Sequence, residues 1–370
     1  MTTNAPDITT VLPKRPRAAA KAASTRLPSL DGLRALSIAL VLFQHLLGTA
    51  GFLSVAMQER IGNWGNLGVR IFFVISGFLI SSLLFDEAAA TGTVSLKQFY
   101  ARRALRILPA SYAYILIVLL LAGLGAVQVD RMQFVAAVAY FMNYKSLLSI
   151  TATGPALAHL WSLAVEEQFY LLWPFLVYLL GKARGLWVIV GVIALVPLLR
   201  LFDLEFYRQH EMGIYAYFHT VSDALAAGCL LACLRSKLLV LNSYQKFLRS
   251  KLFAVVPFSI MAVIVFGHRY SGYMMLLGIT FLNLAIAICI DRVVTLPRSL
   301  VGRVLNWRPV AYMGVLSYSI YLWQELFLVG ALPWPWGVFP LNLLATFAAA
   351  WASHRLIERP FLGLRKRFAK

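Results

Sequence analysis

Long runs of apolar residues alternate with short polar segments along almost the whole chain. Roughly 20 apolar residues are needed for a helix to cross the hydrocarbon core of a bilayer. This pattern predicts an all-α integral membrane protein with about ten transmembrane helices. The runs of spanning length cover residues 30–50, 65–85, 109–126, 160–180, 186–200, 214–234, 252–267, 273–290, 309–330 and 336–357.

A further apolar stretch, 132–148, is ambiguous by length, and the basic residues decide its placement. If it does not cross the membrane, 25 Lys and Arg residues fall on one side and five on the other. Short cytoplasmic loops are enriched in these two residue types. We therefore expect both termini in the cytoplasm, with a re-entrant or interfacial segment near 132–150.

Three regions follow from this division. Residues 1–26 are polar and basic with little to bury, which predicts a disordered cytoplasmic tail. Residues 27–360 form the transmembrane domain, and 361–370 form a second basic cytoplasmic tail. The first apolar run has no small-residue cleavage site and is followed by many more, so we expect a retained helix instead of a signal peptide.

The composition agrees with a membrane protein and narrows its partners. The chain is 60% hydrophobic and 13% charged, with a net charge of +19. Such a charge in a soluble protein would suggest nucleic acid. Here the cations lie in short loops between apolar runs, so no nucleic-acid partner is expected. The three cysteines lie in apolar segments at spacings that indicate neither zinc nor a disulfide framework.

The first apolar run carries an arginine and a histidine, Arg34 and His45, separated by ten residues. Eleven residues are three helical turns plus about 20°, so the two side chains share a face roughly 16 Å apart along the axis. They cannot touch, but they can serve two ends of one cavity. Arg34 can also snorkel to the interface, and His45 can simply bond to a neighbouring helix. Ionisable residues within a span more often face a functional interior.

The second run, NLGVRIFFVISGFLISSLL, contains another buried cation. Arg70 needs an anionic partner, which can be a substrate or a structural ion pair. In the same run, Ser76 and Gly77 are small enough to let a neighbouring backbone or a ligand come close.

A cluster of arginines follows in SLKQFYARRALRILPASY, which we expect to form an interfacial helix. Arg103 and Arg106 are three residues apart and Arg102 and Arg106 four apart, so their side chains converge on a helix. Attraction to anionic headgroups is one interpretation. A clamp for phosphates is the other, because guanidinium groups bind oxyanions through paired hydrogen bonds.

The fourth predicted helix, HLWSLAVEEQFYLLWP, carries a carboxylate on a polar and aromatic face. The residues of this face are spaced three or four positions apart: His159, Ser162, Glu166, Tyr170 and Trp173. Glu166 therefore lies about two turns inside the helix, where it can orient a histidine, bind a sugar hydroxyl or neutralise Arg70.

These segments together resemble one family. RLPSLDGLRALSIALVLFQH, GVRIFFVISGFLI, FYARRALRILP and HLWSLAVEEQFYLLWP are similar, in this order, to signature blocks of the membrane acyltransferase 3 family. TVSDALAAG, YMGVLSYSIYLW and IERPF are similar to later blocks. The resemblance covers about residues 27–365.

The resemblance implies a ten-helix, multi-pass enzyme of the bacterial inner membrane. Its members are acyltransferases that move groups other than amino-acyl groups from cytoplasmic acyl-CoA to a hydroxyl, usually on a sugar of an exported or lipid-linked glycan. We expect an acetyl group, with acetyl-CoA as the donor substrate and no permanently bound cofactor. The expected partners are acyl-CoA, the glycan or lipid-linked sugar acceptor, and membrane lipids.

The resemblance also assigns candidate residues. His45 would be the essential histidine, acting as general base or as acyl carrier, and Glu166 the acidic residue of its block. Arg34, Arg103 and Arg106 would bind the donor. No metal is expected. The substrate-binding candidates are Arg70, Ser76, Trp161 and Ser162.

Two departures from the family pattern and two alternatives complete the prediction. Relatives often have a histidine after the SYSIYLW block, where this chain has Gln324, so we assign that position no chemistry. Some relatives carry a soluble hydrolase-like domain after the last helix, and we expect none here.

Two alternative functions stay open. A transporter or flippase of a lipid-linked saccharide would use the same buried charges, and acylation of a small natural product would use the same chemistry.

Overall fold

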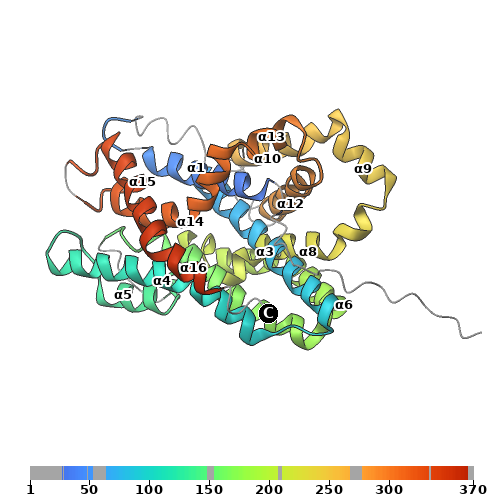
Figure 1. Ribbon diagram of the computed structural model, residues 1–370, viewed down its shortest axis with the longest axis horizontal. Helices are drawn as coiled ribbons and strands as arrows, with labels where there is room; N and C mark the ends of the chain where they lie inside the picture. Colours follow the sequence, from blue (N-terminus) through green and yellow to red (C-terminus); the bar gives the residue numbers. More distant parts are fainter. Residues whose placement is uncertain are drawn as a thin grey trace, which may run out of the picture.

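The computed structural model describes residues 27, 29–47, 49–52, 64–147, 154–206, 211–266, 277–332 and 335–365. In these ranges all regular structure is helical, which confirms the predicted all-α class (Figure 1). The elements are α1 Leu30–Leu46, α3 Trp64–Thr91, α4 Leu96–Gly123, α5 Arg131–Val138, η1 Met142–Tyr144, α6 Leu160–Phe206, α7 Glu211–Ile214, α8 Phe218–Leu238, α9 Asn242–Arg249, η3 Lys251–Ala254, α10 Val255–Phe266, α12 Ile279–Thr295, α13 Leu300–Leu305, α14 Arg308–Leu328, α15 Leu341–Ser353, η6 His354–Glu358 and α16 Arg359–Leu364.

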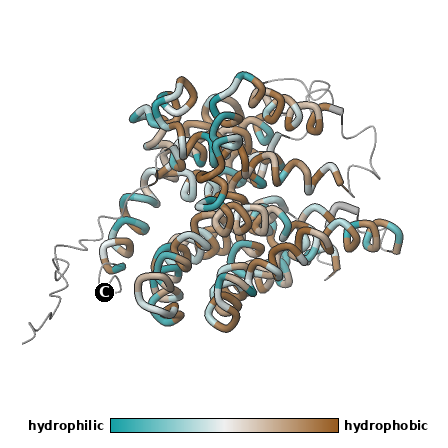
Figure 2. Tube along the Cα trace, turned by 90° about the vertical axis from the view of Figure 1, so that its right-hand side faces the viewer, coloured by the Kyte–Doolittle hydropathy of each residue, from teal (hydrophilic) through white to brown (hydrophobic). Residues whose placement is uncertain are grey.

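Within the described residues, three helices are long and apolar enough to cross a membrane, namely α3, α4 and α6. A fourth candidate is the pair α8 and α9, which is bent by 115°. Most of the helical trace is hydrophobic (Figure 2). These helices support the prediction of a membrane protein, whereas the count of ten spans and the sides of the termini stay predictions.

Two predicted crossings, 160–180 and 186–200, lie in one element of the structure. The element α6 consists of two helices that meet at Gly181, whose φ of 67° lies in the left-handed region that glycine adopts without steric cost. The polar segment expected at 181–185 is therefore a break at Gly181, and the second helix follows it directly.

The segment near 132–150 is short in the structure as well. Its helix α5 has eight residues, a length of about 12 Å, which is too short to cross a bilayer. The short 3-10 helix η1 follows it. Of the predicted tails, 1–26 lies outside the described residues. The boundary at 360 falls inside a helix, because α16 continues to Leu364.

Glycines set the distances between the central helices. A Cβ atom added to Gly77 of α3 would lie 2.0 Å from the Leu225 carbonyl oxygen of α8, and one added to Gly228 would lie 2.1 Å from the Val74 oxygen. In the same way, a Cβ on Gly314 of α14 would lie 1.7 Å from the Asp31 oxygen of α1. Such close backbone contact is how small residues allow helices to pack in membranes.

Replacing these glycines tests the helix crossings. Gly77→Val and Gly228→Val should each lower the free energy of unfolding by about 3 kcal/mol or more, because backbone atoms stand where the new side chain must go. Gly191→Val, on an exposed part of α6 with no neighbour within 4 Å, should change it by less than about 0.5 kcal/mol. The midpoint of thermal unfolding in detergent measures all three. Equal midpoints would contradict the packing described here.

Candidate active site

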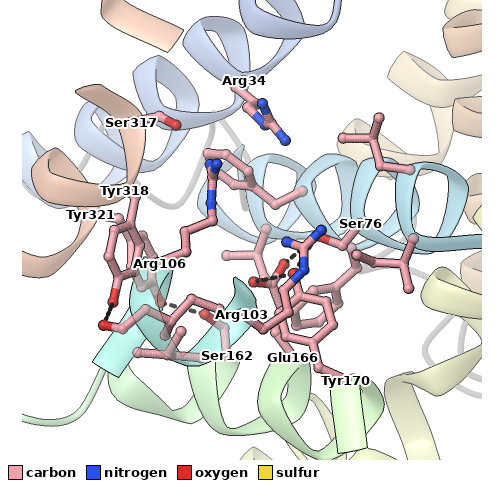
Figure 3. A pocket seen from close by; sticks show the side chains of 17 residues that line it. Arg34, Ser76, Arg103, Arg106, Ser162, Glu166, Tyr170, Ser317, Tyr318 and Tyr321 are labelled. Atoms are coloured by element: carbon pink, nitrogen blue, oxygen red, sulfur yellow. Dashed lines mark hydrogen bonds between the residues drawn. The ribbon is translucent and has the colours of Figure 1, made fainter. Parts of the chain in front are cut away.

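A pocket lies where α1, α3, α4, α6 and α14 meet (Figure 3). It encloses about 820 Å³ of space free of protein atoms, part of it open to solvent. Six of the nine sequence-predicted site residues line it together: Arg34, Ser76, Arg103, Arg106, Ser162 and Glu166. The structure thus brings into one place side chains that are up to 132 positions apart in the chain (Arg34 to Glu166).

The carboxylate of Glu166 is held by two hydroxyl groups. The Ser76 hydroxyl donates to Oε1 at 2.7 Å, and the Tyr170 hydroxyl donates to Oε2 at 3.2 Å. The Tyr170 and Ser76 oxygens are themselves 3.1 Å apart. Because Tyr170 is one turn after Glu166 on α6 and Ser76 belongs to α3, this small network fixes the carboxylate between two helices.

Arg103 is positioned by aromatic rings instead of by a carboxylate contact. Its guanidinium carbon lies 5.2 Å from the centre of the Tyr170 ring and 5.6 Å from that of Phe99, both within cation–π range. Arg102, which the spacing also brought toward Arg106, turns to Glu87 at 3.5 Å and does not line the pocket.

A cation that the sequence did not single out joins this cluster from the end of the chain. Arg365 follows α16, which packs beside α4 (Figure 1). Burial lowers the pKa of the Arg365 guanidinium, and the neighbouring charges of Arg106 and Arg102 lower it further. The proximity of these cations shows how crowded with positive charge the start of α4 is.

The pocket carries an excess of positive charge. Of the charged side chains that line it in the described part of the chain, three are arginines and one is Glu166. Arg34 bonds to Asp31 on its own helix at 3.2 Å and also faces the pocket (Figure 3). Such a site suits an anionic ligand with oxygen acceptors. Among the described residues, no cluster of His, Cys, Asp and Glu could hold a metal ion.

His45 does not lie in this pocket. It lines a separate hollow with Thr49, Ala50 and Gly330, among other residues. The expectation that Arg34 and His45 serve two ends of one cavity is therefore not met in this structure. His45 also makes no described contact with Glu166, because its Nδ1 atom faces the side-chain oxygen of Gln324 on α14.

A buried pair, His159 and Glu325, joins the residue directly before α6 to α14. Nδ1 of His159 is 3.0 Å from the Glu325 carboxylate, which also accepts the His159 backbone N–H at 2.9 Å. The pair adjoins the pocket wall, since the Tyr321 hydroxyl contacts the His159 carbonyl oxygen at 2.6 Å and the Ser162 hydroxyl at 2.6 Å.

Two further predicted residues lie elsewhere. Arg70 is buried, with its Nε 2.7 Å from the Asn66 amide oxygen and one terminal nitrogen 3.3 Å from that of Asn283. It does not contact Glu166 in the described interactions. Trp161 packs edge-on against Phe73 with ring centres 6.2 Å apart, and it is not among the residues that line the pocket.

Sequence reasoning missed several contributors to these sites. Tyr318 and Tyr321 line the pocket from α14, Arg365 adds its charge near Arg106, and Gln324 contacts His45. The block YMGVLSYSIYLW indicated the right helix. The spacing of its hydroxyl residues by about one helical turn is the signal that could have identified Tyr318 and Tyr321. For Gln324, no signal in the sequence linked it to a histidine on the first helix.

The placement of Arg70 generates a prediction. Arg70→Met should lower the free energy of unfolding, because it removes the hydrogen bond to the side-chain oxygen of the buried Asn283, at about 1–3 kcal/mol for an unsatisfied buried group. It should leave the KM for the anionic ligand unchanged. Thermal unfolding and ligand titration on the same preparation measure the two effects. A raised KM at unaltered stability would instead make Arg70 a ligand-binding residue.

Comparison with known proteins identifies the family of the chain. The chain matches the family described as an acyltransferase domain over residues 27–355. It is 30% identical over 358 residues to YrhL of Bacillus subtilis, named as a candidate peptidoglycan O-acetyltransferase, and 30% identical over 361 residues to the O-acetyltransferase OatA of Staphylococcus aureus. It is 29% identical over 359 residues to the peptidoglycan O-acetyltransferase OatA of Listeria monocytogenes.

Each match covers 90% of this chain but little more than half of the relative: 54% of YrhL, 57% of the Staphylococcus aureus protein and 55% of the Listeria monocytogenes protein. The chain therefore spans about half the length of these proteins. No solved structure matches the chain. The family match extends over nearly all of the helices described above. The chain therefore belongs to the membrane acyltransferase 3 family and carries its acyltransferase domain.

Proposed function

We propose that this protein is an acyl-CoA-dependent O-acyltransferase that moves an acetyl group to a sugar hydroxyl of a cell-envelope glycan. The observation that carries the proposal is the convergence of Arg34, Arg103 and Arg106 on one pocket of a family-assigned acyltransferase domain. Relatives named as peptidoglycan O-acetyltransferases make peptidoglycan the leading acceptor. The domain 27–360 would lie in the bacterial inner membrane, with both termini and the start of α4 in the cytoplasm.

The donor would bind at the basic pocket. Coenzyme A carries several phosphates, and guanidinium groups bind phosphate oxygens through paired hydrogen bonds. Arg103 and Arg106 come from the start of α4, where the predicted topology places the cytoplasm, and Arg34 approaches from α1. The apolar wall formed by residues such as Phe72 and Leu79 would accept the pantetheine arm.

The acceptor hydroxyl would react at His45. As a general base, the imidazole takes the hydroxyl proton while the oxygen forms a bond to the thioester carbon. The carbon–sulfur bond then breaks, and the CoA thiolate leaves and receives the proton. As an acyl carrier, the same nitrogen would first take the acetyl group and pass it to the hydroxyl in a second step. Both routes need a neutral ring with one free nitrogen.

The two sites require the donor to extend. Arg34 and His45 are roughly 16 Å apart along α1, and they line different hollows. The thioester end of the donor would extend from the basic pocket to reach His45. Glu166 would shape the donor side through Ser76 and Tyr170 instead of orienting the imidazole.

The arginines provide the first test. Arg103→Ala and Arg106→Ala should each raise the KM for acetyl-CoA about ten-fold or more, since a charge-assisted hydrogen bond contributes about 1.5–3 kcal/mol. Arg184→Ala is the matched control, because Arg184 is exposed on α6 and lies outside the pocket lining. The assay is release of free CoA by purified protein in lipid discs. A uniform change in all three variants would indicate a general charge effect.

His45 provides the second test. His45→Ala should abolish acceptor-dependent CoA release, a loss of about 100-fold or more if it removes the general base, and should remove the acetyl mass from envelope glycans. Wild type, deletion and variant are compared by mass spectrometry at equal expression.

Three other outcomes would each change the proposal. Full acetylation with His45→Ala would assign the chemistry to another residue. Absence of any CoA release in the wild type with glycan acceptors would favour saccharide transport, and acetylation of a small molecule alone would favour the natural-product alternative.

A further inference from the structure

Gln324 is the residue that faces the histidine of the proposed reaction. It lies near the end of α14, which packs along α1 (Figure 1). Its side chain is completely buried, with 0% exposure, and its oxygen Oε1 contacts Nδ1 of His45. His45 itself is only half-buried and borders the open hollow next to Thr49 and Gly330.

The chemistry of the amide determines which ring nitrogen carries the proton. A carboxamide oxygen can only accept a hydrogen bond, and a neutral imidazole has one N–H donor and one acceptor nitrogen. With Oε1 against Nδ1, the proton is on Nδ1 and the lone pair is on Nε2. The partner of one nitrogen thus selects the other as the basic one.

Gln324 contributes this contact at a cost in stability. Its amide nitrogen Nε2 is buried and has no hydrogen-bond partner among the described residues. An unsatisfied buried group of this kind destabilises the folded protein. An apolar residue of similar size would avoid that cost, so packing alone does not account for an amide at this position.

The neighbours of Gln324 hold its backbone in place. Glu325 is bonded to His159, and Nε2 of His159 lies 3.0 Å from the Leu322 carbonyl oxygen. The ring of Trp323 packs against Tyr114 with centres 5.4 Å apart. Positions 322, 323 and 325 of α14 are therefore all fixed by other helices, which restricts the motion of the amide between them.

We propose that Gln324 is a positioning residue, which holds the ring of His45 with Nδ1 protonated and Nε2 free to accept the proton of the acceptor hydroxyl or the acyl group. This inference rests on the proposed function of His45. It assigns a role to a position where relatives often have a histidine. In the described structure, the ionisable groups around His45 are Glu325 of α14, which interacts with it electrostatically, and His159, directly before α6, which is paired with Glu325.

Three variants test the proposal. Gln324→Leu removes the acceptor and should lower kcat by about 10- to 100-fold, the effect of removing the group that orients a metal-bound histidine. The KM for acetyl-CoA, whose proposed pocket is separate, should change by less than about two-fold. Gln133→Leu is the matched control, because Gln133 is also a buried glutamine but contacts the Gly154 backbone, 3.0 Å from its amide nitrogen, instead of His45.

Gln324→Glu distinguishes positioning from packing. The carboxylate has the same shape and accepts from Nδ1, so the variant should retain most of the kcat that Gln324→Leu loses. A negative charge beside the ring favours its protonated form. The acidic limb of the pH profile of kcat should therefore move to higher pH in this variant and stay unchanged in Gln133→Leu.

Two results would overturn the proposal. One is a wild-type kcat and pH profile for Gln324→Leu. The other is an equal loss of kcat in the Leu and Glu variants without a displaced profile, which would mean that Gln324 only packs. Retained activity in His45→Ala is a different result, because it would refute the proposed function of His45 itself. The two failures are therefore distinguishable in one set of assays.

Discussion

Ionisable side chains placed within apolar helices need partners, and this requirement shapes much of the structure. Isolated charges are costly in a medium without water. Arg200 of α6 is therefore paired with Asp223 of α8, and Thr280 of α12 contacts both of them. His159, directly before α6, pairs with Glu325 of α14 in the same way. These pairs connect different parts of the bundle, so satisfying the charges also fixes its arrangement.

The basic pocket is an exception to this pairing of charges. At the start of α4 several cations gather around a pocket whose lining includes a single carboxylate, Glu166. Aromatic rings and hydroxyl groups hold these side chains, so the arginines keep donor capacity for an anionic ligand. The hollow at His45 has a different character. It is lined by aliphatic and small residues such as Leu328 and Gly330, and its histidine faces an amide oxygen instead of a carboxylate. The basic pocket and His45 are thus separated along α1.

Local spacing predicted part of this arrangement correctly. The face of helix four that carries Ser162, Glu166 and Tyr170 does line the pocket, and so do Arg103 and Arg106. Both are consequences of helix periodicity, which acts within a few residues. Spacing along α1 gave the separation of Arg34 and His45 but not the two hollows that they border. Ser162 and Tyr321, which come from two other helices and contact each other, line the pocket of Arg34, while His45 lines the other hollow.

By itself, the sequence determined the all-helical class, the apolar segments and the family, because hydrophobic pattern and ordered motifs are properties of the chain read in one dimension. It also indicated which helix faces are polar. Only the tertiary structure decided which polar faces meet. Arg70 contacts Asn283 of α12 instead of Glu166, Arg365 lies near the basic cluster, and Gln324 faces His45 across 279 positions. Glycine contacts set the helix crossings, and these crossings determine which side chains meet. Partners so far apart in the chain are selected by packing in space and not by periodicity along the chain.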